Sequence, residues 1–345
     1  MCPAADTKCP AVATQCPAVA TQCPAVDTQC PAVATKCPPV SGGTDTGEMP
    51  VYQPGAAVTG TLRTKGSDLL PDVMDRWAKA FVKHQPQVTF DIQSKGSATA
   101  VPALIEKTAD AGPMSRPITP EEAADFQKAY DVPPTTIAVG VDCEGVFVNK
   151  GNPVKGLTLL QLDGIFSKDL RSGHPAVAKW GEVGVADADW ANQAAKPYVK
   201  PGAPALFREL VLLGGEVKEV AADPGPGTAG TAGRPPTALA ADNDPEAIQF
   251  APLAYKSTAA RLVPVSEDGT GPYVEASFAN ALAGKYPLGA VLTINVVKKP
   301  GEPLPPVLRE FLLFVLSREG QEIAAKAGFG SLPSAIVVAE RKKLD

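Results

Sequence analysis

Residues 87–115 read QVTFDIQSKGSATAVPALIEKTADAGPMS, and their order of strand and helix signals indicates the fold. Residues 87–93 alternate apolar and polar side chains, as a half-buried strand does. A helix is predicted over residues 101–108, after a turn that contains glycine and serine, and residues 109–115 predict a short strand or loop. A strand, a helix and a second strand in this rhythm indicate an α/β domain with a mostly parallel sheet.

The flanking residues continue this pattern. Residues 57–67 predict a strand that ends in a Gly-Ser turn. Residues 69–84 predict a helix, because apolar side chains recur at helical spacing at Leu70, Val73, Trp77 and Phe81. The sequence Thr119-Pro-Glu-Glu122 has the form of a capping box, with proline in the first turn, and predicts a helix that ends at Tyr130.

The rest of the chain alternates in the same way. Residues 135–149 form a long β-rich run whose cysteine, Cys143, is expected to be a buried and inert thiol. Helices are predicted over 158–167 and 203–213, and a strand over 290–297. The predicted C-terminal helix has an apolar stripe of Leu308, Phe311, Leu312 and Val315.

The composition is that of an ordinary globular protein. The chain has 345 residues, is 44% hydrophobic and carries a formal net charge of −5, which allows one or two domains with substantial cores. The mild acidity and the absence of a basic patch argue against nucleic acid as a partner. No apolar run in the sequence reaches the roughly 18 residues of a membrane-spanning helix.

The N-terminal residues 1–56 form a low-complexity tail and linker. Six cysteines recur in a Cys-Pro heptad, at Cys2, Cys9, Cys16, Cys23, Cys30 and Cys37. Proline in every heptad excludes a coiled coil, and the small side chains cannot bury a core, so this tail is predicted to be extended and disordered. The Cys-x6-Cys spacing matches no tetrahedral zinc site, while intermolecular disulfides stay open.

Several enzymatic readings fail. The two histidines, His84 and His174, lack the neighbouring motifs of a zinc site or a catalytic triad, so we expect no metal, no cofactor and no enzyme. Residues 225–230 match GxGxxG, but Pro235 and Pro236 prevent the helix that a dinucleotide site requires.

Three turns in the first part of the chain carry a more promising signal. Gly66-Ser67 and Gly96-Ser97 each precede a predicted helix, and so does Ser115-Arg116. The carboxyl ends of parallel strands are where ligands bind, and serine hydroxyls and free backbone N–H groups can hold an oxyanion there. The alternative is that each serine only caps its own helix.

Five segments resemble one family in its order: residues 96–119, 145–167, 180–183, 286–300 and 307–333. They read GSATAVPALIEKTADAGPMSRPIT, GVFVNKGNPVKGLTLLQLDGIFS, WGEV, YPLGAVLTINVVKKP and VLREFLLFVLSREGQEIAAKAGFGSLP. This sequence resembles the periplasmic phosphate-binding proteins of ABC transporters, of the PstS type, from about Thr59 to Pro333.

The resemblance implies a two-lobed fold of the type II periplasmic-binding-protein class, in which each lobe is a mixed, mostly parallel sheet flanked by helices. The first lobe is expected at 57–139 plus 270–345 and the second at 140–269. The implied first-lobe ligand contacts are Ser67, Ser97 and Ser115, with Gly66 and Gly96. Arg116 either supplies charge to the anion or pairs within its lobe.

The second lobe departs from the family pattern. Family members normally contribute an arginine and a GSGT-like turn there, whereas residues 198–207 read YVKPGAPALF. Lys200 and the Gly202 and Ala203 amides are the expected substitutes, although lysine lacks the bidentate fork of arginine.

The resemblance implies a non-enzymatic extracytoplasmic protein that delivers inorganic phosphate or a related oxyanion to an ABC permease. The alternative is a non-transport surface or sensing protein that keeps the fold with a degraded ligand site. Residues 1–50 lack the basic start and apolar run of a secretory signal, so either the protein is cytosolic or its signal lies upstream. Since such proteins are often lipid-anchored through an N-terminal cysteine, Cys2 is the candidate attachment site of a membrane tether, and the expected location is the periplasm or cell surface.

Overall fold

The fold was analysed in a computed structural model, which describes residues 49–199, 205–218, 240–253 and 257–345. The predictions for the heptad tail and Cys2, for Lys200 and its neighbours and for the loop at 225–230 lie outside the described residues. None of the described helices combines the length and apolar character that crossing a bilayer requires.

The part of the chain predicted as the first lobe contributes four strands besides the long strand β4 (Thr135–Asn149). These four are β1 (Gly60–Gly66), β2 (Val88–Ser94), β3 (Gly112–Met114) and β10 (Gly289–Val296). β1 and β2 pair in parallel, and a parallel bridge between Thr64 and Ala111 places β1 beside the start of β3. β10 pairs antiparallel with both β3 and β4.

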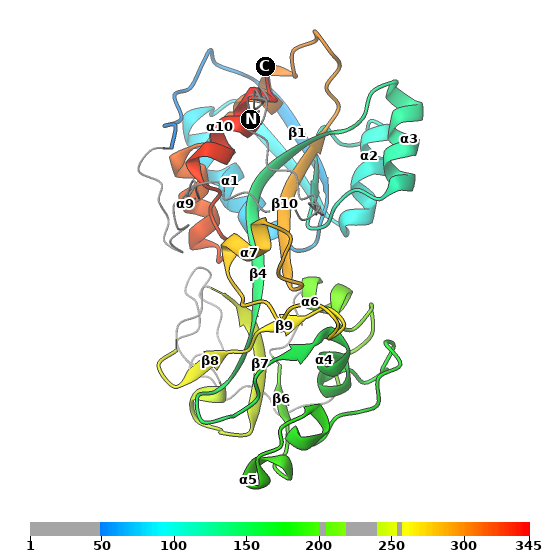
Figure 1. The fold of residues 1–345 in the computed structure, drawn as a ribbon. Coiled ribbons are helices and arrows are strands. Elements are labelled where there is room, and N and C mark those ends of the chain that lie inside the picture. The colour runs from blue at the N-terminus through cyan, green and yellow to red at the C-terminus, as the bar shows by residue number, and fades with distance from the viewer. Residues whose placement is uncertain (1–48, 200–204, 219–239, 254–256) are drawn as a thin grey trace, which may run out of the picture. The chain divides into compact units, whose positions relative to one another are not determined.

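Helices cover these strands on both sides, with α2 and α3 on one side and α1, α9 and α10 on the other (Figure 1). They are α1 (Pro71–His84), the 3-10 turn η1 (Ser97–Thr99), α2 (Ala100–Ile105), α3 (Pro120–Tyr130), α7 (Phe278–Leu282), α8 (Pro306–Val315), α9 (Arg318–Lys326) and α10 (Ser334–Lys342). An aromatic cluster joins α1 to α8: the Phe81 ring lies 5.6 Å from both Phe311 and Phe314.

The part predicted as the second lobe consists of shorter elements. Its strands are β5 (Leu157–Thr158), β6 (Lys196–Tyr198), β7 (Ala247–Pro252), β8 (Ala260–Leu262) and β9 (Val265–Ser266). Its helices are α4 (Leu159–Phe166), η2 (Trp180–Val183), α5 (Ala188–Ala191), α6 (Ala205–Leu210) and η3 (Ala240–Asp242). β7 pairs antiparallel with β4 and parallel with β6, so the sheet is mixed.

Strand β4 belongs to both parts of the sheet, whose order is β3-β10-β4-β7-β6. Thr135–Cys143 pairs with β10, and Glu144–Val148 pairs with β7. The exchange of partners falls between Cys143 and Glu144, and Figure 1 shows β4 running on through it. One continuous strand therefore carries the chain from one part of the sheet to the other.

The structure confirms the predicted α/β class with a mixed sheet. The expected parallel pairing is found for β1-β2, β5-β9 and β6-β7, whereas β4 and β10 pair antiparallel with their described neighbours. The stripe of the first predicted helix is fully buried at Leu70, Val73, Trp77 and Phe81. Both halves of the predicted capping box form, since Thr119 Oγ1 accepts from Glu122 N and a Glu122 carboxylate oxygen accepts from Thr119 N. The helix expected over 203–213 is described from Ala205 and ends at Leu210, earlier than expected, and the lobe boundaries remain a prediction.

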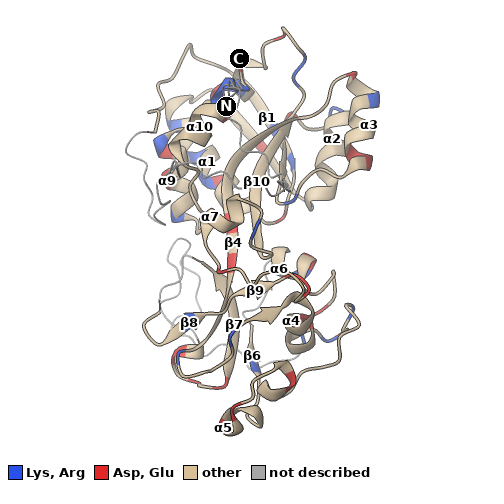
Figure 2. Ribbon diagram, viewed as in Figure 1, with Lys and Arg blue, Asp and Glu red and all other residues tan. Residues whose placement is uncertain are grey.

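Two carboxylates are buried where β4 changes partners. Asp142 and Glu144 are 3% and 2% exposed, and Figure 2 shows acidic residues in the middle of β4. Among the described residues, one carboxylate oxygen of each has no hydrogen-bond partner. Burial raises the pKa of Asp142 to about 6. Burial, together with the neighbouring Asp142 charge, raises the pKa of Glu144 well above its usual range.

These carboxyl groups oppose folding at high pH. Because the two carboxyl pKa values are raised on folding, the folded protein keeps protons that the unfolded chain releases near pH 4. The contribution of Asp142 and Glu144 to the free energy of unfolding therefore falls as pH rises above about 4. Cys143 lies between them, 1% exposed, and its pKa is raised by burial and then by the two carboxylates, as expected for an inert thiol.

Replacing Glu144 with glutamine removes one of these charges at constant size. We expect Glu144→Gln to raise the free energy of unfolding at pH 8 by about 1–3 kcal/mol, and to change it little at pH 4. Urea unfolding of both proteins at each pH measures the difference. Glu267→Gln, at an exposed carboxylate, is the control and should have little effect at either pH. A Glu144→Gln protein less stable than wild type at pH 8 would contradict the assignment.

Candidate functional site

Three strands end side by side at one edge of the sheet. β1, β2 and β3 are linked by parallel pairing, so their carboxyl ends point the same way. The turns after them carry Ser67, Ser97 and Ser115. Backbone bonds join the three turns: Ser67 N donates to Pro113 O at 2.8 Å, and Lys95 N donates to Gly66 O at 2.9 Å.

The structure brings the three predicted serines into one hydrogen-bonded cluster, which we call the serine cluster (Ser67, Ser97 and Ser115). Ser67 Oγ donates to Ser115 Oγ at 2.9 Å, and the Ser97 and Ser115 hydroxyls lie 3.1 Å apart. Ser115 N donates to Ser97 Oγ at 3.2 Å. All three side chains are buried, with exposures of 2%, 8% and 5% in chain order.

These contacts bear on the alternative that each serine only caps its own helix. Ser67 Oγ accepts from Leu69 N, which is a local turn contact, but it also donates across 48 residues to Ser115. Neither η1 nor α2 has a side-chain cap bond at its first position. The hydroxyls therefore bond mainly to one another, and each hydroxyl can rotate to donate to an anion instead.

Two glycines let the backbone adopt this arrangement. A Cβ atom on Gly66 would lie 2.0 Å from the Pro113 carbonyl oxygen, so a larger residue would force the first and third turns apart. Gly96 has φ = +95°, a conformation that residues with a Cβ rarely adopt, and nothing lies within 4 Å of where its Cβ would be. Both predicted glycines are thus required by geometry.

Arg116 pairs within its own part of the chain. Its Nη1 and Nη2 atoms donate to the two Glu122 carboxylate oxygens at 2.9 Å and 2.7 Å. Its Nη1 also donates to Pro117 O at 2.9 Å. The Glu122 hydrogen bond raises the pKa of Arg116, and the same bond lowers the pKa of Glu122. The second of the two alternatives, pairing within the lobe, is what the structure shows for this side chain.

Helix α6 lies against the same turns, which the sequence did not predict. Arg208 Nη2 is 3.4 Å from an Asp68 carboxylate oxygen, and Asp68 directly follows Ser67. Glu209 Oε1 is 3.8 Å from Arg116 Nε, and Arg116 directly follows Ser115. Asp68 and Arg208 are 140 positions apart, and Arg116 and Glu209 are 93 positions apart. No local sequence pattern could therefore have indicated these contacts.

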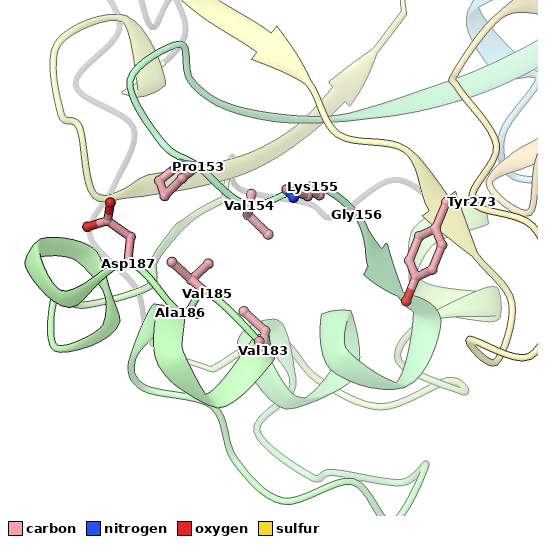
Figure 3. A pocket seen from close by; sticks show the side chains of 10 residues that line it. Pro153, Val154, Lys155, Gly156, Val183, Val185, Ala186, Asp187 and Tyr273 are labelled. Atoms are coloured by element: carbon pink, nitrogen blue, oxygen red, sulfur yellow. The ribbon is translucent and has the colours of Figure 1, made fainter.

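A cavity lies elsewhere, among residues that were not predicted to bind a ligand. It has a volume of about 540 Å³ and is lined by residues 153–156, residues 183–187 and Tyr273 (Figure 3). None of these is a predicted ligand residue, and the side chains labelled in the figure are mostly apolar apart from Lys155, Asp187 and Tyr273. Within the described ranges, no group of three or more histidine, cysteine, aspartate or glutamate residues is placed to hold a metal ion.

The serine cluster lies at the carboxyl ends of parallel strands, which is where open α/β sheets bind their ligands. The family description "PBP superfamily domain" matches residues 52–319. The phosphate-binding protein PstS of Pseudomonas aeruginosa PAO1 is 35% identical over 300 residues, which cover 86% of this chain and 90% of that protein. This chain belongs to the PBP superfamily and, within it, to the PstS-type phosphate-binding proteins.

Solved structures agree with the fold. A protein described as "a possible phosphate binding protein" from Planctomyces limnophilus DSM 3776 superposes with a TM-score of 0.67 at 22% identity, covering 84% of this chain and 98% of that one. An ABC-type phosphate transport receptor from Vibrio cholerae gives a TM-score of 0.54 at 18% identity, over 79% of this chain and 100% of that one.

The Arg116–Glu122 pair should stabilise the turn that carries Ser115. Since the pKa of Glu122 is lowered on folding, its contribution is present above about pH 4.3 and is lost as pH falls through its lower folded value. We expect Glu122→Gln to lower the free energy of unfolding at pH 7 by about 1–2 kcal/mol, with the loss vanishing in acid. Denaturant unfolding at pH 7 and pH 3 tests this.

Glu121→Gln is the matched control, because Glu121 lies in the same helical turn and is exposed. It should cost no more than a few tenths of a kcal/mol at either pH. Equal losses in the two variants would show that general helix-end electrostatics, rather than the Arg116 pair, stabilises this turn.

Proposed function

We propose that this protein binds phosphate or a related oxyanion at the serine cluster and delivers it to an ABC permease. The observation that carries the proposal is the convergence of three serine hydroxyls at the ends of three adjacent parallel strands. Membership of the PstS-type family supports this choice of ligand, since the relative at 35% identity is named a phosphate-binding protein.

The proposed contacts are hydrogen bonds from neutral donors. Ser67, Ser97 and Ser115 donate through their hydroxyls, and Gly66 and Gly96 let the backbone approach the anion closely. Lys200 of the second lobe is the proposed source of charge on the opposite side. Arg116 acts at short range as a fixed positive charge beside Ser115, with its donors directed at Glu122.

Ligand entry requires the two predicted lobes to separate, since the serines are buried. A hinge in the strand that both parts of the sheet share would allow this motion, and closure on the anion would present a surface that a permease distinguishes from the empty form. Such a cycle needs binding and release only, with no covalent step, so the protein acts as a receptor and not as an enzyme. The proposed location is the periplasm or the cell surface.

Isothermal titration calorimetry with inorganic phosphate tests the function. Ser97→Ala should weaken phosphate binding at least tenfold, because a hydrogen bond to a charged ligand is worth about 1.5–3 kcal/mol and 1.4 kcal/mol is tenfold. Thr61→Ala is the control, since it removes an exposed hydroxyl outside the serine cluster. The described side-chain hydrogen bond of this hydroxyl is to Thr89 on the neighbouring strand. Thermal melts confirm that both variants are folded.

Titration of the wild-type protein distinguishes an oxyanion receptor from a surface or sensing protein with a degraded ligand site. Absence of heat with phosphate, sulfate and molybdate would reject the oxyanion receptor. It would favour instead a surface or sensing protein that keeps the fold with a degraded site. The altered sequence at residues 198–207 is the feature that favours this alternative.

A lipid anchor at Cys2 is the proposed tether to the membrane. In protein purified from native membranes, we expect an N-terminal peptide that begins at Cys2 and carries a mass increase of acyl chains. Intact-mass and peptide mass spectrometry measure this. A native protein with an unmodified Met1-Cys2 end would reject the anchor while leaving the proposed ligand untouched.

A further inference from the structure

The carboxyl groups of Asp142 and Glu144 are outside the ligand contacts proposed above, and we call them the carboxylate pair. They are two residues apart on β4, so their side chains project from the same face of the strand, opposite to that of Cys143. Both are buried, and one oxygen of each has no hydrogen-bond partner among the described residues. Like charges this close repel each other, so the pair favours a state that holds at least one proton.

The nearest described elements bring no positive charge to the carboxylate pair. β10 and β7 pair with this stretch of β4 and α7 packs against it, and none of the three contains a titratable residue. Cys143 and Tyr286 lie beside the pair, and the Tyr286 hydroxyl donates to Glu144 O at 2.9 Å. Burial raises the pKa of both the Cys143 thiol and the Tyr286 hydroxyl, so both groups are neutral near pH 7.

The other elements that pack on β4 place their charged groups nearer its two ends. Near the start, Glu340 of α10 accepts from Ala138 N at 2.9 Å, and α9 contributes the neutral amide of Gln321. Near the end, Arg261 of β8 donates to backbone carbonyls that follow the strand, and η3, which carries Asp242, contacts the strand there. Within the described part of the chain, the carboxylate pair therefore has no cation as a partner.

The register of the sheet sets the distance between this pair and the serine cluster. Ala290 of β10 is paired with Asp142 of β4, and Thr293 of β10 is paired with Met114 of β3. Asp142 and Met114 are therefore separated by two strand spacings of about 4.8 Å and by three residues of about 3.3 Å along β10, or about 14 Å in all. Ser115 directly follows Met114, so the serine cluster lies at a similar distance from the pair.

At that distance a bound anion and a charged carboxylate repel each other measurably. In protein with an effective dielectric constant of about 20, two unit charges about 14 Å apart change a binding constant by about five- to tenfold. Salt screens exposed charges that are further apart than the Debye length of about 8–10 Å, but it screens buried charges much less. The carboxylate pair and the serine cluster are both buried, so the repulsion acts on the anion.

We propose that the carboxylate pair couples anion binding at the serine cluster to the uptake of a proton. This rests on the proposed function, because it assigns a regulation to the same site. As the anion binds, a proton passes from water to a carboxylate oxygen of the pair, and it returns to water as the anion dissociates. The protonated pair thus favours binding, and the deprotonated pair favours release.

The coupling acts near neutral pH. Burial raises the pKa of Asp142 to about 6, and the negative charge of a bound anion raises it further. Below about pH 6 the pair is mostly uncharged and the anion binds most tightly. As pH rises from about 6 to about 8, the pair gains negative charge and the affinity for the anion falls.

Phosphate titration of the double variant Asp142→Asn/Glu144→Gln tests the coupling, because this variant stays uncharged at every pH. The ratio of the wild-type Kd to the variant Kd at one pH cancels the ionisation of phosphate itself, since both proteins meet the same ligand. We expect a ratio near one at pH 5, and wild-type binding about fivefold or more weaker than that of the variant at pH 8.

Asp91→Asn is the matched control. Asp91 lies on β2, the strand that leads into the Ser97 turn, but its side chain is exposed. Water and salt screen an exposed charge, so this variant should bind phosphate like the wild type from pH 5 to pH 8. Thermal melts at each pH confirm that the proteins are folded, and Asp142→Asn alone replaces the double variant if the latter does not fold.

Proton counting separates charge from packing. Calorimetry in buffers of different ionisation enthalpy should show that the wild type takes up about half a proton more than the double variant on binding phosphate at pH 6.5. Equal proton uptake, or a Kd ratio that does not change with pH, would retain the proposed function and overturn the coupling. No phosphate binding by the wild type at any pH would reject the proposed function and the coupling together.

Discussion

The fold depends on one strand, β4, that exchanges its hydrogen-bonding partners between Cys143 and Glu144. Before the exchange point, β4 pairs with β10, which in turn pairs with β3. After it, β4 pairs with β7, which in turn pairs with β6. Because β4 is almost continuously buried from Val139 to Val148, both of its faces are covered and its path is fixed by packing. A change of backbone angle at the exchange point would reorient one part of the sheet relative to the other.

Two carboxylate side chains, whose burial is unfavourable, lie at that exchange point. Asp142 and Glu144 each keep a carboxylate oxygen without a described partner, in a strand that is otherwise apolar or glycine from Ile137 to Val148. Buried carboxyl groups of this kind cost stability, and a sequence under selection for stability alone would carry apolar residues there. Their position places this cost in stability at the point where β4 changes its hydrogen-bonding partners.

The sequence predicted those features that depend on local chemistry. The Leu70, Val73, Trp77 and Phe81 stripe predicted α1, and Thr119 and Glu122 predicted the start of α3, because helical spacing and caps are short-range properties. The meeting of the three serines followed from the general rule that parallel strands place their carboxyl ends at one edge.

Features set by tertiary contacts could not be predicted in this way. Arg116 stood beside a predicted ligand serine, yet it pairs with Glu122, whose side chain the capping box already held nearby. Asp68 and Arg208 are 140 positions apart, and tertiary packing, including that of Phe207 against Phe250, brings them together.

The distribution of charge around the site follows from these contacts. Near the serine cluster, the donors of Arg116 are directed at Glu122, so the donors within the cluster itself are neutral hydroxyls and peptide N–H groups. Neutral donors of this kind hold an oxyanion by directed hydrogen bonds, and the directions of those bonds select for its shape.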